Sequence, residues 1–254
     1  MYPTLFEIGG HKLASFGVMM VIALIAGLTM ARKRAPSHGL TPDNITDVSF
    51  WLIIGGILGA RILFIAQEWK DYAAHPRELL TLQFQGLTSF GAFIVGTLVT
   101  IWMCKRKGIP VLSFLDTVAP AFLLGHAIGR IGCLLNGCCH GAPAKSAFPF
   151  VVFSNENHQY DVPAQLYDSA MNIAAMFALL WLEKRYPKQG FSFGMMMVMH
   201  GLARFIYEFF RAGSSSTTIS NLPFTEGHVM ALVIMMVGGF MVLRSKKPAM
   251  VEAV

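Results

Sequence analysis

The sequence predicts an all-α polytopic membrane protein with seven transmembrane helices. Of its 254 residues, 54% are hydrophobic and 13% are charged, whereas a soluble domain carries roughly 25% charged residues. The mean hydropathy is +0.54, and the apolar residues form blocks close to the ~20 residues that a helix needs to cross a bilayer. We expect helices because strands in lipid would need a closed barrel with alternating polarity.

Seven apolar segments follow one another in a single domain that covers residues 1–254. No repeat or low-complexity segment divides them, and no internal linker is evident. The first 13 residues contain Glu7 and Lys12 but no basic stretch, so a cleaved signal peptide is not expected. The predicted spans cover approximately residues 13–31, 48–67, 87–104, 116–135, 164–183, 192–210 and 227–243.

The placement of lysine and arginine predicts the orientation of the chain. Twelve basic residues follow the first, third, fifth and seventh segments, and four lie on the opposite side. Because basic residues concentrate on the cytoplasmic side, the amino terminus is expected outside and the carboxy terminus in the cytoplasm. The formal charge of +6 is confined to small clusters at the ends of spans. It therefore gives no reason to expect a nucleic-acid partner.

Three arginines lie inside predicted spans. Arg61, Arg130 and Arg204 are 13, 14 and 12 residues into their segments, which places them roughly 18–21 Å from the cytoplasmic edge. Each costs at least ~2.5–3.5 kcal/mol at the centre of a span. A single arginine could reach the outer interface or pair with Glu208, Asp168 or a helix carbonyl. Three at one depth favour a polar cavity that binds an anion.

Two more charged residues lie on or just after the sixth segment. Glu208 follows Arg204 at the i+4 spacing of a helical ion pair, and Arg211 lies near the outer headgroups. A guanidinium group suits phosphate because it donates two hydrogen bonds and keeps its proton. A phospholipid headgroup is therefore the anion expected at this depth.

The stretch from Gly125 to Gly141 ends the fourth segment. Gly129 and Gly132 lie beside Arg130 and serve close helix packing, ligand access or both. Asn136-Gly137 predicts the end of a helix and a turn. The Asn136 side chain could cap that helix or donate to a phosphate.

Three cysteines and a histidine occupy the end of the same stretch. The pattern Cys133-x4-Cys138-Cys139-His140 matches no familiar zinc motif, so free thiols or a disulfide are expected rather than a metal. Replacing Cys138 with alanine should accordingly leave activity intact, and no metal or other cofactor is expected. One of His126, His140, His200 and His228 could act as a base, and His140 is the best placed by depth.

These residues resemble the prolipoprotein diacylglyceryl transferase family, and the resemblance extends from about residue 8 to residue 243. Its signature is the run Gly-Arg-Ile-Gly-x-x-x-Asn-Gly at 129–137, followed by Gly141. Further matches are Pro-x-Gln-Leu-Tyr at 163–167, Arg-x-x-x-Glu-Phe-Phe-Arg at 204–211, Gly59-x-Arg61 and the box that starts at Ser89-Phe90. The resemblance implies a seven-span protein of the bacterial inner membrane, with its active site towards the outer leaflet.

The resemblance also implies a reaction. The family transfers diacylglyceryl from phosphatidylglycerol to the thiol of a lipobox cysteine in a prolipoprotein signal peptide, forming a thioether as the first step of lipoprotein maturation. Expected partners are therefore phosphatidylglycerol, the prolipoprotein and membrane lipids. The implied catalytic residues are Arg130, Arg204, Glu208 and His140. The implied substrate-binding residues are Arg61, Asn136, Gly137, Gln165, Tyr167 and Arg211.

Three positions depart from the family's pattern. Gly91 stands where members carry histidine or tyrosine, Phe16 where tyrosine is usual and His228 where glutamine is common. Two alternatives follow from these departures. One is a divergent paralogue that uses another acceptor. The other is a phospholipid-binding or transport protein without catalytic activity.

Overall fold

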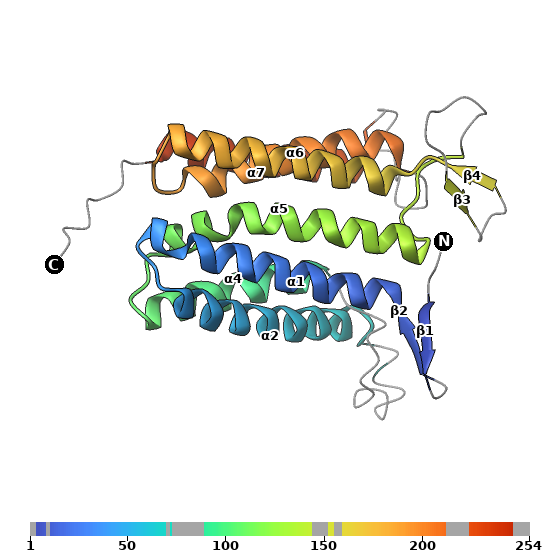
Figure 1. Cartoon of the computed structure of the whole chain (residues 1–254), viewed down its shortest axis with the longest axis horizontal. Coiled ribbons are helices and arrows are strands. Elements are labelled where there is room, and N and C mark those ends of the chain that lie inside the picture. Colours follow the sequence, from blue (N-terminus) through green and yellow to red (C-terminus); the bar gives the residue numbers. More distant parts are fainter. Residues whose placement is uncertain are drawn as a thin grey trace. The chain divides into compact units, whose positions relative to one another are not determined.

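The computed structural model describes residues 4–8, 11–69, 72, 89–143, 152–154, 159–211 and 224–245. This part of the chain is mostly helical, and each of the seven predicted segments lies largely on a long helix, with residues 87 and 88 of the third segment outside the described residues (Figure 1). The helices are α1 (Ser15–Arg34), α2 (Pro42–Gln67), α4 (Ser89–Arg106), α5 (Val111–Asn136), α6 (Ala164–Arg185), α7 (Phe191–Phe210) and α8 (Glu226–Arg244). A 3-10 turn, η1 (Ala35–His38), follows α1.

Two antiparallel hairpins correct the all-α prediction. β1 (Thr4–Ile8) pairs with β2 (His11–Ala14), and β3 (Val152–Ser154) pairs with β4 (Gln159–Asp161). The first predicted span began at Leu13, but that residue belongs to β2. Strands of three to five residues are invisible to a hydropathy argument that looks for blocks about 20 residues long.

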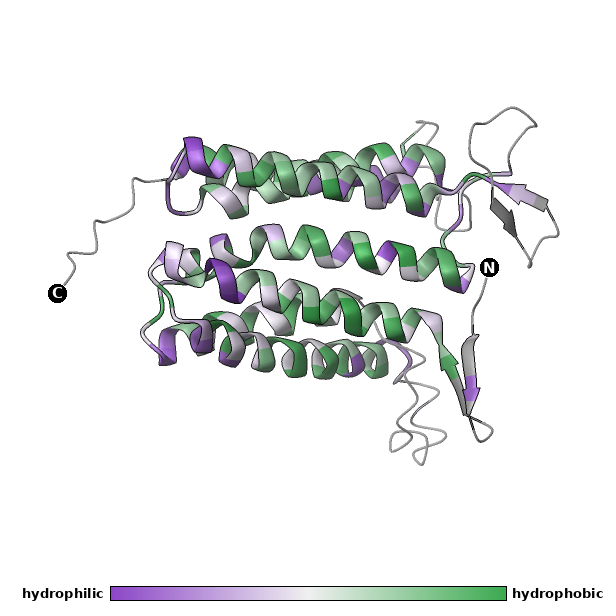
Figure 2. Cartoon of the chain, in the orientation of Figure 1, coloured by the Kyte–Doolittle hydropathy of each residue, from purple (hydrophilic) through white to green (hydrophobic). Residues whose placement is uncertain are grey.

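Four helical segments of the described chain are long and apolar enough to cross a membrane. They are Ser15–His38, Pro42–Gln67, Val111–Asn136 and Glu226–Arg244. Figure 2 shows hydrophobic residues along all the long helices, with hydrophilic positions at their ends and at a few interior places. α6 is less apolar because one of its faces carries four buried polar residues: Gln165, Asp168, Ser169 and Asn172.

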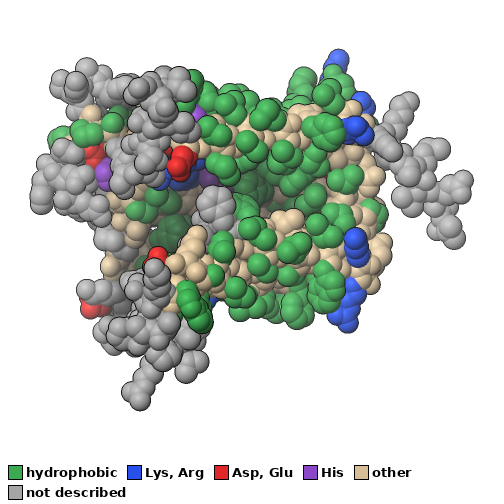
Figure 3. Space-filling model, turned by 180° about the vertical axis from the view of Figure 1, so that it is seen from behind, with side chains coloured by type: hydrophobic (Ala, Val, Ile, Leu, Met, Phe, Trp, Pro, Cys, Tyr) green, Lys and Arg blue, Asp and Glu red, His purple; other side chains and the backbone are tan. Residues whose placement is uncertain are grey.

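Basic residues mark the ends of alternate helices. Lysine or arginine occupies the last turn of α1, α4, α6 and α8, and none occupies the last turn of α2, α5 or α7. Figure 3 shows a face that is largely hydrophobic along the helices, with lysine and arginine gathered at helix ends. This is the pattern expected when neighbouring helices run in opposite directions across a bilayer.

The chain divides into two compact units, residues 32–114 and residues 1–31 with 115–254. In the first unit, α2 and α4 pack through two glycines. A Cβ atom added to Gly91 would collide with the carbonyl oxygen of Gly59, and one added to Gly59 would collide with that of Gly91. A histidine or tyrosine at position 91 has no room in this packing. The single domain expected from sequence stays a prediction.

The second unit contains α5, α6, α7 and α8 and carries most of the predicted site. Its core joins Ala119 and Leu123 of α5 to Met176 and Leu179 of α6 and to Met196 of α7. Asp116 ties α5 to the start of α7. Its carboxylate accepts hydrogen bonds from the backbone amides of Gly190 (2.6 Å) and Phe193 (2.8 Å), which the first turn of a helix cannot satisfy by itself.

Candidate active site

The end of α5 has the geometry that Asn136-Gly137 predicted. Gly137 has φ 82°, its amide donates to the carbonyl of Leu134 (3.2 Å), and the amide of Cys138 donates to that of Cys133 (3.1 Å). These two bonds with a left-handed glycine form a Schellman motif. Glycine is required here because side chains rarely tolerate positive φ.

The segment after α5 is bonded to both α6 and α7. The Gly141 amide donates to the Val162 carbonyl (2.8 Å), and the Ala142 amide donates to the Phe210 carbonyl (3.1 Å). A Cβ atom on Gly141 would lie 2.6 Å from the Phe210 oxygen. The glycine therefore lets the segment pass between the start of α6 and the end of α7.

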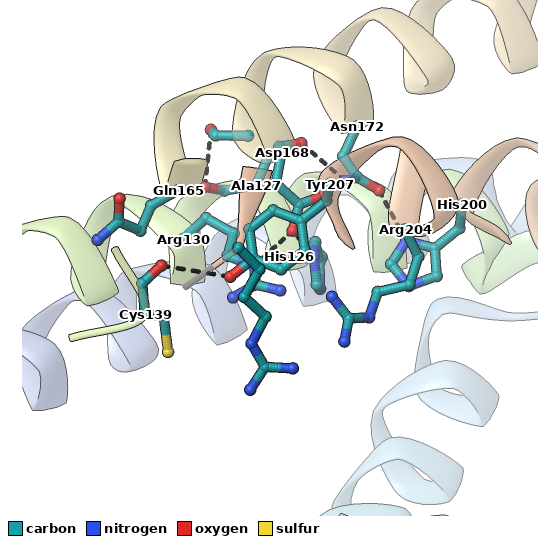
Figure 4. A network of polar contacts seen from close by, with 12 residues as sticks. His126, Ala127, Arg130, Cys139, Gln165, Asp168, Asn172, His200, Arg204 and Tyr207 are labelled. Carbon is teal, nitrogen blue, oxygen red and sulfur yellow. Dashed lines mark hydrogen bonds and ion pairs between the residues drawn. The ribbon is translucent and has the colours of Figure 1, made fainter. Parts of the chain in front are cut away.

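Arg130 forms a buried ion pair with α6. Its Nε lies 2.6 Å from Oδ2 of Asp168, whose side chain is almost completely buried. His126, one turn earlier in α5, lies beside the pair: its Nε2 is 3.2 Å from Asp168 Oδ2 and 3.4 Å from Arg130 Nε. Figure 4 shows the three side chains converging between α5 and α6. Both Arg130 contacts use Nε, so neither involves the two terminal nitrogens.

A chain of hydrogen bonds continues from Asp168 into the helix bundle (Figure 4). Asn172 Nδ2 donates to Asp168 Oδ1 at 2.7 Å, and Nδ1 of His200 lies 2.8 Å from Asn172 Oδ1. Because that amide oxygen only accepts, Nδ1 of His200 is the donor. Ser169 donates to the Ala127 carbonyl at 2.9 Å. Asn172 of α6 thus holds one oxygen of the Asp168 carboxylate, while Arg130 and His126 of α5 lie at the other.

Tyr207 of α7 lies against both arginines. The Arg130 Cζ is 4.7 Å from the centroid of the tyrosine ring, and the Arg204 Cζ is 4.9 Å from it. Cations at this distance are attracted to the ring. The hydroxyl donates to the carbonyl of Cys139 at 3.3 Å, so one side chain links the two guanidinium groups to the segment after α5.

Glu208 organises the second arginine. Its Oε2 lies 2.8 Å from Arg204 Nη2 and 3.8 Å from Arg211 Nη1. Its Oε1 accepts a hydrogen bond from the Thr225 hydroxyl at 3.0 Å. Nη1 of Arg204 is buried without a hydrogen-bond partner among the described residues. A buried donor in this state is available to an anion.

Gly227, at the start of α8, leaves room for the carboxylate of Glu208. A Cβ atom at Gly227 would lie 2.5 Å from Glu208 Cδ, whereas one at Gly239 of the same helix meets nothing within 4 Å. Gly227→Ala is therefore expected to displace the carboxylate and to lower stability by about 1–3 kcal/mol. Thermal unfolding of the purified variant measures the loss of stability. Gly239→Ala is the matched control, and equal behaviour of the two variants would contradict this role of Gly227.

His228 has a structural position. Its Nδ1 accepts from the backbone amide of Thr225 at 3.1 Å, as the third helical residue of a capping box does. Three aromatic rings surround it, with centroids 4.5–5.5 Å away, and belong to Phe205, Phe209 and Phe224. A glutamine at this position could make the same backbone contact, which accounts for the exchange of these two residues.

The remaining predicted residues take several positions. Gln165 donates to the Cys138 carbonyl (2.7 Å), and the Tyr167 ring packs on Phe210. The Asn136 side chain hydrogen-bonds to the thiol of Cys138.

His140 and Arg61 make other contacts. His140 Nδ1 lies 3.0 Å from the buried carboxylate of Asp161. Arg61 belongs to the unit of residues 32–114, with its Cζ 5.7 Å from the Tyr72 centroid. Its part in the site stays a prediction.

Sequence reasoning missed Tyr207, Asn172 and Thr225, and it treated Asp168 only as one possible partner for an arginine. A signal was present in α6. Its polar residues recur at spacings of three and four, which places them on one face of a helix that must turn towards other helices rather than lipid.

The thiols of Cys133, Cys138 and Cys139 lie within 4.8 Å of one another, and all are free. A hydrogen bond from the Cys133 thiol, together with the positive charges of Arg130 and Arg211, lowers the pKa of Cys139 to about 5. Burial raises the pKa of Cys138. Of the two thiols beyond α5, Cys139 is the more exposed and the more acidic.

Iodoacetamide at pH 6 is therefore expected to alkylate Cys139 before Cys138. The thiolate is the reacting form, and a pKa near 5 keeps Cys139 ionised at this pH while Cys138 stays protonated. The rate at Cys139 should stay level above pH 6 and fall below pH 5. Peptide mass spectrometry of metal-free protein gives the order of labelling. Labelling of Cys138 first would contradict the assignment.

A model of the family described as prolipoprotein diacylglyceryl transferase matches residues 3–244. The phosphatidylglycerol–prolipoprotein diacylglyceryl transferase of Clostridium tetani is 33% identical over 97% of this chain and 100% of its own length. One from Clostridium perfringens, named transferase 2, is 33% identical over 83% of this chain and 84% of its own. One from Synechococcus elongatus is 31% identical over 74% and 67%. Together with the arginine site on α5 and α7, these matches show that the chain belongs to the prolipoprotein diacylglyceryl transferase family.

Proposed function

We propose that this protein transfers the diacylglyceryl group of phosphatidylglycerol to the thiol of a lipobox cysteine in a prolipoprotein. The bond between the glycerol carbon and the phosphate oxygen breaks, a carbon–sulfur bond forms, and glycerol phosphate leaves. The thiol proton passes to a base. The product is a thioether-linked lipoprotein precursor, and the step begins lipoprotein maturation.

The observation that carries this proposal is the pair of arginines around Tyr207. The phosphodiester has one negative charge, and the leaving phosphomonoester gains a second. Guanidinium groups fixed beside the departing oxygen stabilise that additional charge most strongly in the transition state. Arg204 Nη1, which is buried and has no partner among the described residues, is a donor for the phosphate. Arg130 reaches it with the terminal nitrogens that the Asp168 pair does not use.

Carboxylates and neighbouring side chains position these two arginines. Glu208 holds Arg204 and draws Arg211 towards the same oxygen. Asp168 holds Arg130 from the polar face of α6. We assign headgroup contacts to Arg211, and the lining of the lipid site to Asn136, Gly137, Gln165 and Tyr167.

We assign the base to His140. Its Nδ1 lies 3.3 Å from the Gly141 carbonyl oxygen and 3.0 Å from the buried Asp161 carboxylate, and these two acceptors can orient the ring. His126 is the second candidate, because it contacts Arg130 and Asp168 directly. Turnover against pH separates them. His140→Ala should remove the ionisation of a base from the profile, and His126→Ala should leave that ionisation in place while lowering the rate.

We further propose seven membrane spans, an outer amino terminus, a cytoplasmic carboxy terminus and a location in the bacterial inner membrane. The alternation of basic and non-basic final turns supports this orientation. In that orientation α5 ends on the outer side, and its last turns carry Arg130 towards the outer leaflet. Residues 1–254 then act as one domain.

The test is turnover by purified protein in phosphatidylglycerol vesicles with a lipobox peptide. The expected result is release of glycerol phosphate with an equal amount of thioether-linked peptide, and no product from a peptide with serine at the lipobox cysteine. Complementation of a transferase-depleted strain extends the test to cells. Headgroup release without lipidated peptide would favour another acceptor. Lipid binding without turnover would favour a non-catalytic protein.

A further inference from the structure

Three cysteine thiols converge just beyond α5, next to the arginine site. We infer that Cys133, Cys138 and Cys139 bind one thiophilic divalent cation, for which Zn²⁺ is the natural candidate. Their sulfur atoms already lie within 4.8 Å of one another. A tetrahedral site with Zn–S distances near 2.3 Å needs sulfur separations of about 3.8 Å. Closing the three thiols around an ion therefore takes movements of roughly 1 Å.

The backbone around the thiols is built to bring them together. The Schellman motif folds the chain back so that the Cys138 amide meets the Cys133 carbonyl, and the Cys138 Sγ lies 3.7 Å from the same oxygen. Cys139 then has φ 62°, the one positive φ of a non-glycine residue in the described chain. Such a conformation costs roughly 1–3 kcal/mol and persists only where the surroundings hold it.

Buried side chains of two other helices hold this backbone. Gln165 of α6 donates to the Cys138 carbonyl at 2.7 Å, and Tyr207 of α7 donates to the Cys139 carbonyl at 3.3 Å. Both contacts involve carbonyl oxygens, so neither of them occupies a thiol. The cluster is thus set in place before any ion binds.

The charge balance also favours a divalent cation. Three thiolates and one Zn²⁺ carry a net charge of −1. Arg130 lies against the ring of Tyr207, whose hydroxyl donates to the Cys139 carbonyl. This guanidinium group would therefore favour an anionic complex at the three thiols. Thiolates select soft cations over Mg²⁺ or Ca²⁺. Water completes the tetrahedron, because three protein ligands leave one position open.

Spectroscopic titration tests the site without measuring transfer of lipid, so its outcome is separate from that of the proposed reaction. Reduced, metal-free protein is titrated with Co²⁺, which develops a sulfur-to-cobalt charge-transfer band when thiolates bind it. Zn²⁺ is then added to displace the Co²⁺. We expect one equivalent to bind. Cys133→Ser, Cys138→Ser or Cys139→Ser should weaken binding at least about 100-fold, more than the loss of an outer partner costs.

Cys104→Ser is the matched control, because this buried thiol of α4 lies outside the cluster, and it should bind as the wild type does. A second measurement does not depend on the folding of variants: Zn²⁺ should protect the three clustered thiols of the wild type from alkylation and leave Cys104 unaffected. Two results would overturn the inference. One is the absence of saturable binding to the wild type. The other is a disulfide between two of the three cysteines in protein taken directly from its membrane.

Discussion

Turnover is expected to fall by about 10³-fold in the Arg130→Ala protein, the loss typical of removing one donor to a developing oxyanion. Arg130→Lys should still lose about 100-fold although it keeps the charge. Lysine carries a single ammonium group, whereas Arg130 gives its Nε to Asp168 and keeps two terminal nitrogens for another ligand. Release of glycerol phosphate from phosphatidylglycerol measures the loss.

Asp168→Asn tests whether Asp168 positions Arg130, as distinct from the binding of phosphate by Arg130 itself. It removes the charge that holds Arg130 and keeps a side chain of the same shape beside Asn172. We expect kcat to fall by about 10–100-fold. Because Asp168→Asn and Arg130→Lys disturb the same ion pair, the loss of kcat in the double variant should be smaller than the product of the two single losses. Arg185→Ala, at the exposed end of α6, is the control. Wild-type turnover by Arg130→Lys would contradict the assignment of a bidentate clamp.

The helices could be predicted because each is a long apolar block, and the predicted limits differ from those in the structure by up to six residues. The hairpin at 4–14 could not, because alternation over so few residues is lost beside a 20-residue span. Gly91, which stands where the family carries histidine or tyrosine, shows a different limit of prediction from sequence. The sequence showed that a histidine was absent, but only the contact with Gly59 explains why the position is glycine.

Of the charged pairs in the site, one could be predicted from the sequence and one could not. Arg204 and Glu208 are one helical turn apart, so local spacing predicted their contact. Arg130 and Asp168 are 38 positions apart on different helices. Counting residues along each span predicts that they lie at a similar depth in the membrane, but it does not show that they form a pair. Tyr207 was missed because an aromatic residue in a span is ordinarily a packing residue. Its position between two cations depends on the rotation of α7 about its axis.

Glu208→Gln is expected to lower kcat by about 100-fold, or about 2.7 kcal/mol of transition-state stabilisation. The carboxylate lies near two guanidinium groups, 2.8 Å from Arg204 and 3.8 Å from Arg211. An amide removes the charge that balances them, and the two cations then repel each other at short range. Arg204 is expected to leave the orientation in which Nη1 meets the phosphate.

The Michaelis constant tells this effect from simple loss of structure. Glu208 is an anion next to the site of another anion, so its neutralisation leaves the affinity for phosphatidylglycerol equal or higher. We therefore expect KM to stay constant or fall while kcat falls, the pattern of an interaction that serves the transition state. Glu226→Gln, at the exposed start of α8, should leave both constants unchanged. A rise in KM with unchanged kcat would show that Glu208 only shapes the lipid site, and Arg204 would then have to be oriented by Tyr207 alone.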